Sequence, residues 1–306
     1  MAKSIGVVLT DQVTAGLVEN HELVGAPIHL PKEYDENGLI EIPKEQLCHL
    51  ICDAVVELVP REAAISAVGV AMPGIVMKGV LEDSPNLPQL KGTHVCKDVS
   101  AELKGRGFDF RVSLCNDADA AAAGVAATRK EFNKLVRVWT IGNGIGFGRY
   151  PYTEGAWEGG HMVVSLDPKE RYCGCGGKGH LEGIMGNRAM RLRFLDMEPD
   201  EVFQAAKSGD RRCAEFVDLW HRALAAATAS QIHLEGPGRF YYTGRDINRL
   251  DLNTLRHYLY EMVKMSPLQS YTVDVLPEDR LRTVVGAAVA AERGERNYRD
   301  SGPTVS

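Results

Sequence analysis

Short runs of β-branched and apolar residues alternate with longer stretches of helical periodicity, and this alternation most restricts what the chain can fold into. Strands are predicted over SIGVVLT, ISAVGVAMPGIV, FRVSLCN, LVRVWTIGNGIGFGRY and RFYYTG. The first of these runs and TAGLVENHELVG, separated by a polar turn, predict a hairpin. Helices are predicted over KEQLCHLICDAVVELVP, DADAAAAGVAATRKEF, residues 186–207, residues 212–234 and RTVVGAAVAAERGER. The pattern therefore indicates a mixed α/β fold.

The length of the chain bears on its domain organisation. A chain of 306 residues exceeds the usual size of one hydrophobic core, so we expect two domains or one elaborated α/β domain. Composition changes most sharply near Cys115 to Asp117, which suggests a hinge there. Hydrophobic residues make up 44% and charged residues 25%, which is ordinary for a chain that folds by itself.

Charge and hydropathy restrict the partners. Lys and Arg total 35 against 41 for Asp and Glu, a net charge of -6, and no basic run stands out, so nucleic acid is not an expected partner. The N-terminal MAKSIGVVLTDQ does not read as a signal peptide. No apolar stretch reaches the roughly 18 residues of a membrane span. We therefore expect a cytoplasmic protein with no membrane partner.

The segment YCGCGGKGHLEG concentrates ligand-type side chains in the middle of the chain. Cys173, Cys175 and His180 offer three zinc ligands, and His161 in EGGHMVV is the candidate for the fourth. Four protein ligands leave no open position for water, so the zinc would be structural. The alternative is a loop with two free thiols and a surface histidine. The other cysteines lie in apolar or helical contexts and are expected to act as small hydrophobic residues: Cys48, Cys52, Cys96, Cys115 and Cys213.

Carboxylates near these ligands and at a strand end are further candidates. Glu158 and Glu182 each lie close to a ligand, so they either line a polar pocket held by the metal or are solvated surface residues. In LCNDADAAAAG, Asn116 and Asp117 stand where a strand ends and a helix begins. The helix start itself favours such residues, as it does Asp119. A carboxylate at this position of an α/β fold also suits a general base.

Several segments together resemble one family. In order and spacing, Asn116-Asp117, GNGIGFG, GAWEGGH, CGCGGKGHLE and GAAVAA resemble the ROK family of sugar kinases and repressors. VGVAMPGIV from Val68 and SPNLP from Ser84 look like two more of its segments. The resemblance implies an actin-like or hexokinase-like (ribonuclease H-like) α/β fold, with two domains and a cleft between them. It places residues 1–115 in a smaller domain, on which the helix of about 282–296 packs, and residues 116–281 in a larger domain that carries the zinc.

The resemblance also implies roles for residues. Asp117 would be the general base, and the sugar's other hydroxyls would be held by Asn86, Asn116, Glu158, His161 and Glu182. Zinc would be bound by His161, Cys173, Cys175 and His180, which would fix the sugar-recognition loops. His180 stands where the family usually has a third cysteine, and imidazole is a sound zinc ligand.

The nucleotide side departs from the family pattern. Family kinases begin with a strand followed by DxGGT, whereas this chain has IGVVLTDQVTAG, with Asp11 displaced and no glycine pair. The second phosphate loop, usually GTG, is Gly142, Asn143 and Gly144. The adenosine loop, usually GGG, is TGRD, with Gly244 followed by Arg245. Losing such contacts should cost several kcal/mol of transition-state stabilisation unless other groups replace them.

Two functions follow from this mixture. The first is a carbohydrate kinase that transfers phosphate from Mg-ATP to a hydroxyl, on C6, of a hexose or N-acyl hexosamine. The second is a sugar-binding sensor that has lost ATP phosphate binding. A DNA-binding repressor is the least favoured class, because no helix-turn-helix extension is seen at the N-terminus. The resemblance also implies a homodimer or homotetramer.

Overall fold

The computed structural model describes residues 3–33, 35, 38–60, 64–152 and 158–293. They form two compact units, which are described one at a time. The first unit draws on residues 1–133, 148–156 and 279–306, and the second on residues 134–147 and 157–278.

A five-stranded sheet forms the centre of the first unit, in the order β3-β2-β1-β4-β7. Its strands are β1 (Lys3–Leu9), β2 (Val13–Glu19), β3 (Glu22–Leu30), β4 (Ile65–Met72) and β7 (Val112–Asn116). β1 pairs antiparallel with β2 and parallel with β4, which pairs parallel with β7. The predicted hairpin is present. TAGLVENHELVG is not one strand, however, because Asn20 and His21 adopt φ values of 55° and 65° and turn the chain between β2 and β3.

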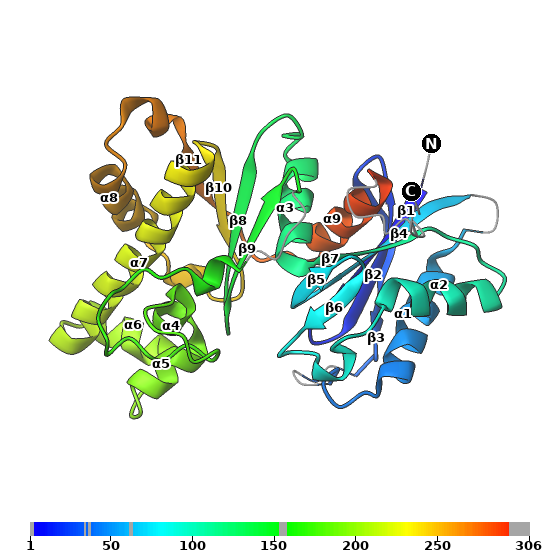
Figure 1. Cartoon of the computed structure of the whole chain (residues 1–306), viewed down its shortest axis with the longest axis horizontal. Helices are drawn as coiled ribbons and strands as arrows, with labels where there is room; N and C mark the ends of the chain where they lie inside the picture. Colours follow the sequence, from blue (N-terminus) through cyan, green and yellow to red (C-terminus); the bar gives the residue numbers. More distant parts are fainter. Residues whose placement is uncertain (1–2, 34, 36–37, 61–63, 153–157, 294–306) are drawn as a thin grey trace, which may run out of the picture. The chain divides into compact units, whose positions relative to one another are not determined.

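Helices cover both faces of this sheet. Figure 1 shows α1 (Lys44–Leu58) and α2 (Val95–Gly105) on one face, and α3 (Asp117–Thr128) and α9 (Arg280–Glu292) on the other. A large apolar core fills the α1 and α2 side. A small hairpin of β5 (Ile75–Met77) and β6 (Val80–Asp83) and the 3-10 turn η1 (Pro88–Leu90) complete the described elements of this unit.

Helices α3 and α9 pack against each other with their backbones close together. A Cβ added to Gly286 would lie 1.8 Å from the Ala120 carbonyl oxygen, and one added to Gly124 would lie 2.0 Å from that of Arg282. The alanine-rich sequences of both helices fit this close approach, since small side chains let backbones meet. Because of this packing α3 groups with the first unit, whereas the sequence-based boundary at residue 115 assigned it to the second. Residues 294–296 of the expected final helix lie outside the described part of the chain.

The second unit is built on a four-stranded sheet, in the order β11-β10-β8-β9. Its strands are β8 (Val136–Ile141), β9 (Ile145–Tyr150), which begins in this unit, β10 (Arg239–Thr243) and β11 (Thr272–Val275). β10 runs parallel to both β8 and β11. Buried aromatic side chains from the sheet and from the long helix α7 (Arg211–Glu235) share one core, among them Trp139, Trp220, Phe240 and Tyr242.

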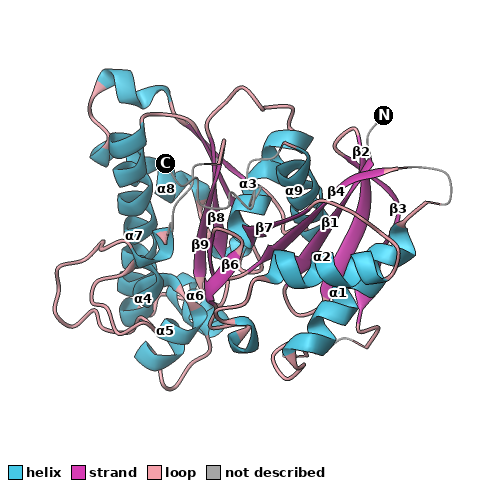
Figure 2. Ribbon diagram, turned by 45° about the vertical axis from the view of Figure 1, so that its right-hand side comes forward, coloured by secondary structure: helices cyan, strands magenta, loops and turns pink. Residues whose placement is uncertain are grey.

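Helices surround α7, which contacts α4 (Leu181–Met185), α6 (Pro199–Lys207) and α8 (Leu252–Met262) (Figure 2). The helix expected over 186–207 is divided into α5 (Asn187–Arg193) and α6. The break follows from Pro199 at the first helical position and a capping box of Glu198 and Glu201. Three 3-10 turns complete the described elements: η2 (Gly159–His161), η3 (Ile247–Arg249) and η4 (Ser266–Ser270). In the described residues, no helix is both long and apolar enough to cross a bilayer.

Candidate functional site

Four side chains of the second unit converge as the sequence predicts. The ligand atoms of His161, Cys173, Cys175 and His180 all lie within 4.8 Å of one another. The two sulfur atoms are 3.4 Å apart, and the Cys175 Sγ is 3.2 Å from His180 Nδ1. Zinc with Zn–S of about 2.3 Å and Zn–N of about 2.0 Å separates its tetrahedral ligands by roughly 3.3 to 3.8 Å. The donor set therefore suits a zinc ion, and the S–S and S–N separations lie close to this range.

Glycines allow the loop to wrap around the cluster. Gly176 and Gly179 have φ values of 82° and 69°, a region that favours glycine. A Cβ on Gly177 would lie 2.0 Å from the His180 ring, and the backbone N–H of Gly177 donates to the Cys175 sulfur at 3.3 Å. The glycine-rich composition is thus a steric requirement of this geometry.

A buried ion pair fastens the same loop, and the sequence reasoning missed it. Glu170 pairs with Arg193 of α5, and both side chains are largely buried. The Glu170 carbonyl oxygen accepts a hydrogen bond from the backbone N–H of Gly179 at 2.6 Å. The Arg193 guanidinium also lies 4.5 Å from the centre of the Tyr172 ring. The partners are 23 residues apart in the chain, so no local pattern could have shown the pairing.

Burial sets the protonation of two cluster residues in the absence of a metal. It raises the pKa of the Cys173 thiol to about 11. Burial, and then the neighbouring His161, lower the pKa of His180, which favours the neutral imidazole that coordinates metals. An ion at this cluster would therefore have to displace the Cys173 proton. Burial likewise raises the pKa of Cys52 and Cys96 to about 12, in keeping with inert hydrophobic cysteines.

Glu182 at the start of α4 lies between the metal cluster and a glycine loop. Its Oε2 accepts a hydrogen bond from the backbone N–H of Ile145 at 3.0 Å. Its Oε1 lies 3.8 Å from His161 Nε2 and 4.0 Å from the Cys173 sulfur. Glu158, 41% exposed, lies 3.7 Å from His161 Nδ1 through its Oε2. Both acidic residues thus adjoin His161. Residues 155–157 of the GAWEGGH segment lie outside the described part of the chain.

The Asn-Asp junction belongs to the first unit, where β7 leads into α3. Asn116 is the N-cap: its Oδ1 accepts from the backbone N–H of Ala118 at 2.8 Å, and its Nδ2 donates to the Gly74 carbonyl oxygen at 2.9 Å. Asp117 is the first residue of α3 and is half-buried, and its Oδ1 also accepts from Ala118 at 2.9 Å. Both side chains thus accept the Ala118 N–H at the start of α3, as the predicted helix start favours. Asn86 is exposed, between β6 and η1.

Two glycine segments expected to bind a nucleotide lie in the second unit. Gly142 to Gly144 join β8 to β9, and a Cβ on Gly142 would meet open space. Gly144 is packed against Glu182, whose Oε2 would lie 2.6 Å from an added Cβ. Gly244 follows β10 with a φ of 117°, and a Cβ there would lie 2.4 Å from the Ile141 carbonyl oxygen. Gly244 thus has a backbone conformation that favours glycine, and the open space at Gly142 leaves room for a phosphate group to approach the backbone.

The turn between β1 and β2 does not fit a phosphate loop. Thr10, Asp11 and Gln12 fill it, and none of them is glycine. The Asp11 carboxylate accepts a hydrogen bond from Arg280 of α9 at 2.6 Å, with only 15% of the Asp11 side chain exposed. Asp11, which is displaced from the aspartate position of the family's DxGGT motif, thus forms an ion pair with Arg280.

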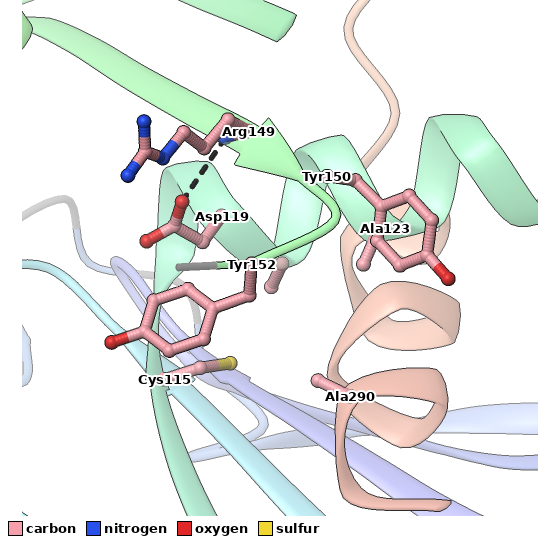
Figure 3. Close-up of a pocket in the computed structure, with 8 residues that line it drawn as sticks. Cys115, Asp119, Ala123, Arg149, Tyr150, Tyr152 and Ala290 are labelled. Atoms are coloured by element: carbon pink, nitrogen blue, oxygen red, sulfur yellow. Dashed lines mark hydrogen bonds between the residues drawn. The ribbon is translucent and has the colours of Figure 1, made fainter. Parts of the chain in front are cut away.

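A small pocket in the first unit is no substrate site, since it holds about one water molecule. Its lining comes from β7, α3, α9, the end of β9 and the residues after β9: Cys115, Asp119, Ala120, Ala123, Arg149, Tyr150, Tyr152 and Ala290. Figure 3 shows the Asp119 carboxylate accepting a hydrogen bond from the backbone N–H of Arg149, at 3.1 Å. Asp119 thus ties α3 to β9.

Comparison with known sequences gives consistent matches. The profile of the ROK family matches residues 28–293. A glucokinase of Thermotoga maritima is 27% identical over 291 residues, which cover 84% of this chain and 88% of that protein. An N-acetylmannosamine kinase of Haemophilus influenzae is 26% identical over 72% of this chain and 73% of its own length. A glucokinase of Pyrobaculum calidifontis is 31% identical over 54% of this chain, and the match spans 57% of that enzyme.

Solved structures match over nearly the whole chain. A ROK hexokinase from Thermus thermophilus superposes with a TM-score of 0.76 at 22% identity, covering 95% of this chain and 98% of its own. A ROK family glucokinase from Streptomyces griseus, in complex with glucose and AMPPNP, gives 0.68 at 21% identity, covering 96% and 100%. The expected actin-like or hexokinase-like α/β fold is thereby confirmed.

Proposed function

Since the chain belongs to the ROK family, we propose that it is a sugar kinase that phosphorylates a hydroxyl, on C6, of a hexose or N-acyl hexosamine. The named functions of its relatives support this class, since they include glucokinases and N-acetylmannosamine kinases. A sugar is thus the proposed partner, and the homodimer or homotetramer inferred from the sequence remains part of the proposal.

The observation that carries the proposal is Asp117 at the start of α3. Its half-buried carboxylate stands where β7 ends and α3 begins, the place of a general base in an α/β fold. We assign Asp117 as the general base: its carboxylate would take the proton of the attacking sugar hydroxyl. The sugar oxygen would bond to the γ-phosphorus of ATP as the bond from that phosphorus to the oxygen of the leaving ADP breaks. Mg-ATP, when bound, supplies the phosphoryl group and neutralises its charge.

The remaining sugar hydroxyls are assigned to Asn86, Asn116, Glu158, His161 and Glu182. Glu158 and Glu182 both adjoin His161, one of the four proposed zinc ligands. Zinc bound there would hold the imidazole and, through it, the two carboxylates in fixed positions. The structural zinc would thus act on sugar recognition and not on the chemical step.

The proposed nucleotide contacts are Gly142, Asn143, Gly144 and Gly244. The open space at Gly142 and the positive φ of Gly244 support this assignment. The β1–β2 turn is evidence against nucleotide binding, because the ion pair of Asp11 and Arg280 lies where family kinases have a glycine pair. This single feature favours a second candidate, a sugar-binding sensor that performs no phosphoryl transfer.

A coupled assay separates the two. Zinc-loaded protein is mixed with Mg-ATP and, in turn, glucose, mannose, fructose, N-acetylglucosamine and N-acetylmannosamine, beside the variant Asp117→Asn. Turnover on one sugar that falls by about 10² to 10⁴ in the variant is the result expected of a kinase with this base. No turnover on any sugar, while one of them still raises the melting temperature, would reject the kinase in favour of the sensor.

A further inference from the structure

The second unit contains a buried polar cluster next to its glycine loops. Asn187 opens α5, Asp246 follows β10 and Arg249 ends η3. Asn187 is 6% exposed, Asp246 7%, and the Arg249 side chain 7%. Burying such groups is costly unless their hydrogen bonds are made.

The three side chains satisfy one another. Asn187 Nδ2 donates to Asp246 Oδ2 at 2.8 Å, and its Oδ1 accepts from Arg249 Nη1 at 2.5 Å. Arg249 Nη2 lies 3.2 Å from Asp246 Oδ1, which closes the ring of contacts. Outside the ring, Arg249 Nε donates to Asp200 of α6 at 2.8 Å.

Both glycine segments are attached to this ring. Asn187 Nδ2 lies 3.4 Å from Asn143 Oδ1, and the Asn187 backbone N–H donates to the Gly142 carbonyl oxygen at 3.4 Å. The backbone N–H of Asp246, two residues after Gly244, donates to the Ile141 carbonyl oxygen at 3.2 Å. The amide of Asn143, which replaces the hydroxyl of the family's GTG, is thus the link from the first loop to the ring.

We propose that Asn187, Asp246 and Arg249 are positioning residues that set the spacing of the 142–144 loop and the Gly244 loop for a nucleotide. Net stability is a weak reason to keep a buried ion pair, because its desolvation offsets much of the attraction. Phosphoryl transfer, in contrast, depends on placement of the phosphates. The inference rests on the nucleotide contacts assigned above, and it gives the chain a means of holding phosphate contacts despite the altered β1–β2 turn.

The test measures Mg-ADP binding by titration calorimetry, which needs no turnover. Asn187→Ala removes both donors of the ring's central amide and is expected to raise the Kd for Mg-ADP about tenfold, equal to about 1.4 kcal/mol. Amide hydrogen exchange in residues 141–146 and 244–248 should become faster without any nucleotide present. Thr228→Val is the matched control, because it removes the buried hydrogen bond to the Tyr242 hydroxyl in the same unit and touches neither loop.

The control should lower the melting temperature and leave the Kd for Mg-ADP within about twofold of wild type. An unchanged Kd in Asn187→Ala, or an equal rise in Thr228→Val, would overturn the inference, as would a wild type that binds no Mg-ADP. Failure of the kinase proposal alone looks different: the wild type would bind Mg-ADP, Asn187→Ala would weaken that binding, and neither protein would transfer phosphate to any sugar.

Discussion

At the residue scale, the four residues of the candidate metal cluster are each positioned by a different local structure. Cys173 is buried beside α4, and Cys175 is exposed in the glycine turn. His180 precedes α4 as its N-cap residue, and His161 ends η2. Cys173, Cys175 and His180 come from one short segment, and only His161 comes from a different part of the chain.

Replacing a turn cysteine should remove the metal. Cys175→Ser is expected to abolish stoichiometric zinc binding at neutral pH, because it leaves two imidazoles and one thiolate. Metal content by atomic emission after gel filtration is the measurement. Cys213→Ala is the control, since Cys213 is a buried cysteine of the same unit that packs near Met197. Zinc retained at one per chain in Cys175→Ser would contradict the assigned ligand set.

At the scale of elements, two helix–helix contacts should affect stability in ways that the sequences of the helices do not show. The α3–α9 contact depends on the absence of a side chain at Gly286. The α7–α8 connection depends on His221, which donates from Nδ1 to the Val217 carbonyl oxygen and accepts at Nε2 from the backbone N–H of Asp251 at 2.9 Å. Both contacts are buried, so small changes there should be costly.

The packing of α9 can be tested with one added methyl group. Gly286→Ala should lower the free energy of unfolding by about 3 kcal/mol, because the new Cβ would lie 1.8 Å from the Ala120 carbonyl oxygen. Gly105→Ala in α2 meets nothing within 4 Å and should be neutral or up to about 1 kcal/mol stabilising. Urea unfolding of the two variants is the comparison. Equal stability would mean that α9 does not pack as described.

The α7–α8 connection should make stability depend on pH. Burial lowers the pKa of His221, so between that value and the usual 6.5 the unfolded chain binds more protons than the folded one. Its contribution is therefore fully present above about pH 6.5 and is lost as pH falls, by up to about 1.4 kcal/mol per pH unit. Denaturant unfolding from pH 5 to 7.5 should show a smaller slope in His221→Gln than in wild type. Parallel slopes would rule out a buried neutral His221.

At the scale of the whole molecule, two separate hydrophobic cores support two compact units. The metal cluster belongs to the second unit, and its four ligands make no part of the first. Stability of the two units should therefore respond differently to loss of the ion.

Chelation provides that test. Treating zinc-loaded protein with EDTA is expected to speed amide exchange in η2, α4 and the 170–180 loop by tenfold or more, a loss of about 1.4 kcal/mol or more of local stability. Exchange in α1 and β4 of the first unit serves as the internal control and should stay within about twofold. Exchange that is unaltered everywhere would show that no structural metal was bound.

The sequence by itself determined most of the helices and strands and the family, because both depend on residue patterns within short segments. Apolar spacing predicted α1, alanine content and leading acidic residues predicted α3, and the glycine-rich Cys-x-Cys segment predicted that Cys173, Cys175, His180 and His161 come together. Helices α2, α4 and α8 and strands β6 and β11 were not predicted from the sequence.

Only the tertiary structure decided which distant residues meet. It joined Asp11 to Arg280 across 269 positions and Asn187 to Asp246 across 59, and it packed α3 on α9. Local periodicity carries no information about such pairs, since they depend on the path of the chain through space. For the same reason, neither the 142–144 sequence nor the Gly244 sequence alone shows how far apart the two glycine loops lie in the folded chain.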